Sequence, residues 1–144
     1  MLRIYAFYVF FATFAISCNS NSQTVKLGDI VGKWKDDSSL AKVDFFSNGT
    51  CVVTDIPADY FFFPPEDFKN KIFSGKGNWS LKKGNHFGEI LINLNSVSDI
   101  DKNGVSFSLH VAGRNGLFDN KPPWYIFMWE DDEGGNRIKF DRVK

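Results

Sequence analysis

The sequence has few of the residues on which most enzymes and metal sites depend. It contains two histidines and two cysteines among 144 residues, and 17 basic residues balance 17 acidic ones. Zero net charge provides no general attraction for nucleic acid, so we expect no nucleic-acid partner. The sequence also lacks His-Glu-x-x-His, Gly-x-Ser-x-Gly, phosphate-loop and Cys-x-x-Cys motifs. We therefore expect no catalytic site, no metal and no other cofactor.

The polar clusters that are present have ordinary structural explanations. Asp99–Gly104 matches the first half of a calcium loop, but His110 occupies the position of the bidentate glutamate, so a hairpin turn is favoured. Glu130–Glu133 precedes a Gly-Gly pair and is typical of a solvated turn. Neither His86 nor His110 has a neighbouring partner that would activate it, and Cys51 is expected to be an inert core thiol. A hydrolase assembled from distant residues remains the alternative.

Aromatic residues are abundant. They make up 17% of the chain and include 16 phenylalanines. A chain of this length forms one domain with its own core. The rings must therefore fill that core, line a cavity or meet a partner.

The beginning of the chain predicts export. Residues 4–16 form an uncharged, mostly apolar run that is too short to span a bilayer but suits a signal peptide over residues 1–17. Ala15-Ile16-Ser17-Cys18 resembles the lipobox of bacterial lipoproteins, which implies that Cys18 is acylated. Residues 18–27 would then be the lipidated cysteine and a polar tether to a membrane of the bacterial envelope, which we expect to be the outer membrane. The domain would lie in the periplasm or at the surface, and the lipid anchor would be its only membrane contact.

Cysteine pairing is the competing interpretation of this segment. If the signal peptide is cleaved before Cys18, that residue and Cys51 could form one disulfide in an oxidising compartment. If Cys18 is acylated, Cys51 is alone.

From residue 28 onward, apolar residues recur with a period of two, which predicts half-buried strands. Val105, Phe107 and Leu109 alternate with polar residues, for example. The strand near residue 126 is apolar on both faces. A short helical segment is expected only at 65–71. The eight expected strands cover residues 30–36, 41–46, 51–56, 73–81, 89–95, 105–112, 124–130 and 137–143.

Turn sequences separate these strands at short intervals. Asn48-Gly49, Asn103-Gly104 and Asn115-Gly116 favour tight hairpins, which join antiparallel strands. Residues 28–144 are therefore predicted to form a single all-β domain. An antiparallel up-and-down barrel of about eight strands is favoured, and a β-sandwich is the alternative.

Gly32-Lys33-Trp34 resembles the Gly-x-Trp motif of lipocalins. In that family the tryptophan closes one end of an eight-stranded barrel and an arginine near the last strand packs over it. Arg142 is the preferred candidate for this arginine, and Arg137 is the other. The resemblance implies a lipocalin-like barrel that binds small apolar molecules.

The sequence Tyr60-Phe61-Phe62-Phe63 is the best candidate for a binding surface. Successive residues of a strand point to opposite faces, so two of these four rings would point outward unless a loop covers them. Phe118 and Trp124, beside a second proline pair, are expected to complete the same rim. The rim would contact a small hydrophobic molecule or another envelope protein, as an inhibitor or immunity-type lipoprotein does.

Overall fold

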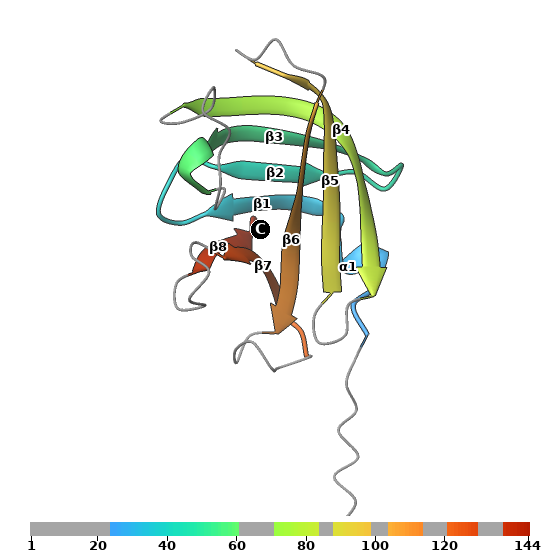
Figure 1. Cartoon of the computed structure of the whole chain (residues 1–144). Helices are drawn as coiled ribbons and strands as arrows, with labels where there is room; N and C mark the ends of the chain where they lie inside the picture. Colours follow the sequence, from blue (N-terminus) through green and yellow to red (C-terminus); the bar gives the residue numbers. More distant parts are fainter. Residues whose placement is uncertain (1–23, 61–70, 84–87, 99–103, 114–120, 130–136) are drawn as a thin grey trace, which may run out of the picture.

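Eight strands close into an antiparallel barrel in which each strand pairs with its neighbours in the sequence and β8 pairs with β1 (Figure 1). The computed structural model describes residues 24–60, 71–83, 88–98, 104–113, 121–129 and 137–144. A one-turn helix, α1, precedes the barrel, and a short 3-10 helix, η1, follows β3. The elements are α1 (Leu27–Ile30), β1 (Gly32–Asp36), β2 (Lys42–Phe45), β3 (Thr50–Pro57), η1 (Ala58–Tyr60), β4 (Ile72–Lys83), β5 (Gly88–Val97), β6 (Val105–Gly113), β7 (Trp124–Trp129) and β8 (Arg137–Arg142).

The predicted up-and-down barrel is confirmed, and pairing of β8 with β1 rules out the alternative sandwich. Each of the eight expected ranges coincides with one strand. The first differs most, because Ile30 ends a helical turn and the strand begins only at Gly32. Gly32 has a φ of +135°, a conformation that side chains disfavour. The helical segment expected at 65–71 falls mostly outside the described residues.

Because successive strands alternate in direction, their termini fall at two ends of the barrel. One end carries α1, the β2–β3 hairpin and the C-terminus of β8, and we call it the closed end. The opposite end, which we call the open end, carries the C-terminus of β1, η1 and the N-terminus of β6. Figure 1 shows η1 and α1 on opposite sides of the barrel.

Two glycines let β4 bend between the two halves of the sheet. In Figure 1, β1–β3 run side by side, β5 and β6 cross them steeply, and β4 curves from one set to the other. A Cβ atom on Gly77 would lie 2.0 Å from the backbone oxygen of Asn93, and one on Gly75 would lie 2.6 Å from that of Ser96. The register of β4 against β5 shifts beside Gly77. Bulges and glycines of this kind give a sheet the curvature that closes it.

The predicted turn at Asn48-Gly49 joins β2 to β3. Gly49 has a φ of +82°, and its N–H donates to the carbonyl of Phe46. Trp79 of β4 fastens this turn twice, since its backbone N–H donates to the Gly49 carbonyl at 2.8 Å and its indole N–H to the Phe46 carbonyl at 3.0 Å. The hairpin is thereby fixed to the barrel wall.

The core occupies the lumen of the barrel. Inward-facing side chains from all eight strands belong to one apolar cluster. Ile92, Leu109 and Ile126, near mid-strand, have no exposed surface. Trp34, Phe45 and Phe140 are among the largest fully buried side chains. The middle of the lumen is therefore packed.

Candidate binding site at the open end of the barrel

The closed end is sealed by Trp34 and its partners. The indole N–H of Trp34 donates to the Ile30 carbonyl at 2.7 Å, which attaches α1 to the base of the core. The guanidinium carbon of Arg142 lies 5.8 Å from the centre of the Trp34 ring, and its Nη2 donates to the Val31 carbonyl. A Cβ on Gly32 would lie 3.1 Å from that Nη2. The glycine thus leaves room for the arginine over the ring.

This is the arrangement that the Gly-x-Trp resemblance implied for Gly32, Trp34 and Arg142. Arg137, the other candidate, lies at the opposite end of β8 and stacks on Phe127 instead. The eight-stranded antiparallel barrel with this closed end is compatible with a lipocalin-like fold.

The open end is less completely packed than the rest of the lumen. The ladder between β6 and β7 comprises His110–Gly113 of β6 and Trp124–Phe127 of β7. Val105 and Phe107 precede that ladder, face inward and keep partial exposure. Val97, at the end of β5, is also half-buried against the core. Apolar surface therefore remains accessible where β6 extends beyond its ladder with β7.

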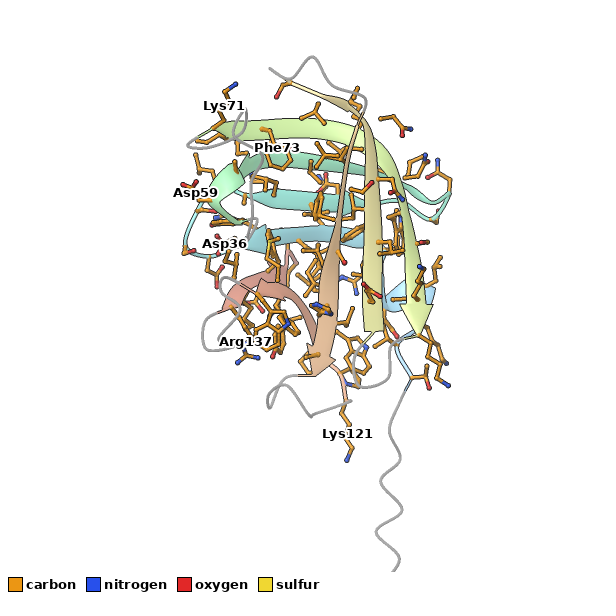
Figure 2. The ribbon with its side chains drawn as sticks, viewed as in Figure 1. Asp36, Asp59, Lys71, Phe73, Lys121 and Arg137 are labelled. Carbon is orange, nitrogen blue, oxygen red and sulfur yellow. The ribbon has the colours of Figure 1, made fainter. Side chains whose placement is uncertain are left out.

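A hydrogen-bonded carboxylate lies at the same end. Asp36 is the buried charged residue of the described chain, with 3% of its surface exposed. Its carboxylate accepts hydrogen bonds from the N–H and hydroxyl of Ser38, from the hydroxyl of Ser39 at 2.6 Å and from the hydroxyl of Tyr60. Figure 2 shows Asp36 on the same side of the barrel as Asp59, Lys71 and Phe73. We call Asp36 and its three donor residues the Asp36 cluster.

Hydrogen bonding keeps this carboxylate ionised. Burial raises the pKa of Asp36, but the hydrogen bonds from Ser39, Tyr60 and Ser38 outweigh burial, and the pKa lies below its ordinary value. Burial, and then the hydrogen bond to Asp36, raise the pKa of Tyr60. The donors occupy the acceptor positions of both carboxylate oxygens. The cluster therefore positions η1 against β1 rather than offering a free acceptor to a ligand.

A second aromatic cluster lies on the outer face of β6–β8. Phe127 has no exposed surface and packs against Tyr125, Ala112 and the partly exposed Trp129. Arg137 lies 5.6 Å from the centre of the Phe127 ring and donates to the Tyr125 hydroxyl at 2.8 Å. The sequence predicted a strand that is apolar on both faces, and these rings are the outer face of that strand.

Side chains with catalytic potential are dispersed. His110 lies on the outer wall, opposite Glu89 in the register and 5.3 Å from the Phe127 ring centre. Burial lowers the pKa of His110, against the opposing effect of Glu89. Burial raises the pKa of the Cys51 thiol to about 11, so this thiol is protonated and unreactive at neutral pH. Within the described ranges no three His, Cys, Asp or Glu residues are grouped as metal ligands would be.

The structure separates residues that the sequence analysis placed on one rim. Tyr60 ends η1 at the open end, whereas Trp124 begins β7 at the closed end. The expectation that they share a rim is wrong. In an up-and-down barrel each strand carries the chain from one end to the other. Three strands, β4, β5 and β6, lie between Tyr60 and Trp124, so these two residues fall at opposite ends. Cys18, Phe61, Phe62, Phe63 and Phe118 lie outside the described residues, as do His86 and Glu130–Glu133.

Asp36, Ser38 and Ser39 were missed in the sequence. A signal was available, since Asp36-Asp37-Ser38-Ser39 ends a strand with residues whose side chains bond to nearby backbone. The bond from Tyr60 to Asp36 could not be read from that pattern.

Comparison with protein-family models, curated proteins and solved structures gave no match to this chain. Among the helices that the structure describes, none is long and apolar enough to cross a membrane.

Proposed function

We propose that this protein is an envelope-anchored lipoprotein whose lipocalin-like barrel binds a small hydrophobic molecule at the open end. One observation carries the proposal: the inward-facing apolar residues Val97, Val105 and Phe107 keep exposed surface, while the middle of the lumen is packed. The mouth of a β-barrel with partly exposed apolar side chains is a typical place for a small ligand.

The packing limits what this end can hold. Leu109 and Ile92, which face the centre of the lumen, have no exposed surface, so the ligand would contact the outer part of the lumen only. Recognition would come from apolar and aromatic contact, because the acceptors of Asp36 are already engaged. Contributions from Phe61, Phe62 and Phe63, which follow Tyr60 in the sequence, stay a prediction.

The anchor rests on the sequence around Cys18. An acylated cysteine followed by a polar tether would hold the domain at a membrane of the bacterial envelope. Cys18→Ser should abolish acyl labelling and membrane retention. A variant that stays on membranes through a high-salt wash would contradict the anchor.

Ligand binding can be tested by native mass spectrometry. Residues 24–144 would be exported without the anchor and purified from the envelope of their own cell under gentle conditions. We expect a co-purifying small molecule that is lost in Phe107→Asp, because a charge replaces an inward apolar contact. Ser106→Asp is the matched control, since Ser106 is the exposed, outward neighbour on the same strand. A folded domain without bound material, or equal binding by both variants, would contradict the proposal.

A protein partner at the same end is the second candidate function. Leu40 is 69% exposed and Ile72 is 62% exposed, and both lie at the open end. Exposed apolar side chains beside a packed lumen favour contact with another protein. A photo-crosslinker at Ile72 that captures one envelope protein, together with a bare mass in the experiment above, would favour this function.

A further inference from the structure

The zero net charge of the chain conceals an uneven distribution of charge. Lysines that are exposed gather at the closed end: Lys26 before α1, Lys33 at the start of β1, Lys82 and Lys83 at the end of β4, Lys121 before β7, and Lys144 after β8. The acids of that region in the described residues are Asp29, Asp44, Glu89 and Asp141, and all four are half-buried. The carboxylate of Asp29 is further engaged by the Lys26 N–H at 2.8 Å.

The open end has no such excess of lysine. Asp37 and Asp59 are exposed there, and Asp36 and Asp55 are close to them in the chain. Lys42, Lys71 and Arg137 are its exposed described cations, so acids and cations are close to balance there. Figure 2 shows Asp36 and Asp59 on one side together with Lys71 and Arg137, and Lys121 at the far end of the molecule.

Apolar side chains accompany the lysines at the closed end. Leu27 of α1 is 50% exposed, Phe46 is 45% exposed and Val143 is 49% exposed. Phe46 directly follows the Phe45–Gly32 pair, and the Val143 N–H donates to the Lys33 carbonyl at 2.9 Å. The hairpin, the start of β1 and the end of β8 are thus neighbours. A surface that mixes basic and exposed apolar side chains suits the interface of an anionic bilayer.

The expected anchor would be attached to the barrel at this end, because Cys18 precedes α1 in the sequence. Lys26 is eight residues beyond Cys18, and eight extended residues span no more than about 29 Å. An acylated Cys18 would therefore hold α1 close to the headgroups. Attraction to surface charge falls off within about 8 Å at physiological salt, so it acts on the end that the tether keeps near the membrane.

We propose that the closed end is a membrane-docking surface, which rests on anionic lipid headgroups through its lysines and through Leu27, Phe46 and Val143. The proposal rests on the proposed anchor at Cys18, and it adds an orientation. With the closed end on the bilayer, the open end faces away from the membrane. Its ligand or partner then arrives from the aqueous side.

Orientation can be measured with a fluorophore at either end of the full-length acylated protein. Phe46→Cys places a thiol at the closed end, and Leu40→Cys places one at an exposed apolar position of the open end. Cys51 is buried and its raised pKa leaves it unlabelled. The labelled proteins are reconstituted into vesicles of phosphatidylethanolamine and phosphatidylglycerol that contain a headgroup nitroxide lipid. Vesicles of phosphatidylcholine with the same nitroxide lipid are the neutral comparison.

At low salt we expect several-fold stronger quenching at position 46 than at position 40 in the anionic vesicles. The difference should shrink in neutral vesicles, and also when Lys82 and Lys83 are both changed to glutamine. Lys71→Gln, at the open end, is the matched control and should leave it unchanged. Equal quenching at the two positions, or stronger quenching at position 40, would overturn the proposal.

Failure of the anchor gives a different result. It appears as loss of co-flotation with vesicles at high salt, whereas docking is read from position-specific quenching at low salt. A protein without an anchor should still be quenched at position 46 in anionic vesicles, and absence of that quenching overturns docking.

Discussion

The hydroxyl of Tyr60 donates a hydrogen bond to the carboxylate of Asp36, which lies 24 residues earlier in the chain. This bond joins η1 to β1 across the open end, although β2 separates β1 from β3 in the sheet. Two serines complete the carboxylate's partners. The position of η1 is therefore set by a polar contact in addition to apolar packing.

Removing the Tyr60 hydroxyl tests this contact. Tyr60→Phe leaves a buried carboxylate with one donor fewer, which should lower the free energy of unfolding by about 1–3 kcal/mol. In a double-mutant cycle with Asp36→Asn, the double mutant should lose less stability than the sum of the two single losses, because both substitutions remove the same bond. Urea denaturation of the four proteins provides the values. Strict additivity would show that the two groups act independently.

Trp34 should be the most costly single truncation at the closed end. Trp34→Ala removes a ring that is 1% exposed and the indole bond to the Ile30 carbonyl, with an expected loss of about 3–5 kcal/mol. The comparison is Trp129→Ala on the outer face, where the ring is partly exposed, and its loss should be smaller. An unchanged melting temperature for Trp34→Ala would remove the role assigned to that ring.

Gly77 should not tolerate a side chain. A Cβ there would meet the Asn93 oxygen at 2.0 Å and the Leu94 Cα at 2.6 Å, and these backbone atoms cannot move aside without breaking the β4–β5 ladder. Gly77→Ala should therefore yield little folded protein. Gly28→Ala is the matched control, because nothing lies within 4 Å of its Cβ and alanine favours the helical turn of α1. Circular dichroism and soluble yield measure both variants.

His110 should make stability depend on pH. Burial lowers its pKa in the folded protein, so the unfolded chain binds a proton more readily. The stabilising contribution is fully present above the ordinary histidine pKa of 6.5 and is lost as pH falls from there towards the lower folded pKa. Melting temperatures between neutral pH and about pH 5 should fall less in His110→Gln than in the natural chain, within the range where histidine titrates. Parallel profiles would contradict a lowered pKa, since His86 is common to both proteins.

Thiol counting distinguishes the fates proposed for the cysteines. Cys51 is buried with a pKa of about 11, so the native protein should not react with a thiol reagent at neutral pH. After unfolding, an acylated and processed chain should show one thiol, and an unprocessed reduced chain two. A protein with a Cys18–Cys51 disulfide would show none until it is reduced. That last result would contradict acylation of Cys18.

The alternation of residues predicted the strands because side chains of a strand point to opposite faces and one face must be buried. Val105, Phe107 and Leu109 showed this directly. Asn48-Gly49 likewise predicted a hairpin because its residues tolerate positive φ. The error at Trp124 has a related cause: adjacency of aromatics to proline pairs was taken as proximity, whereas the direction of each strand decides at which end a connection lies.

The sequence by itself determined the number of strands, their antiparallel order and the position of Trp34 near one terminus of the barrel, since these depend on local periodicity and turn chemistry. Only the tertiary structure decided that Arg142 rather than Arg137 covers Trp34, that Tyr60 reaches Asp36, and that exposed lysines gather at one end. These are contacts and distributions between residues distant in the chain. They follow from barrel closure and register, which no short stretch of sequence encodes.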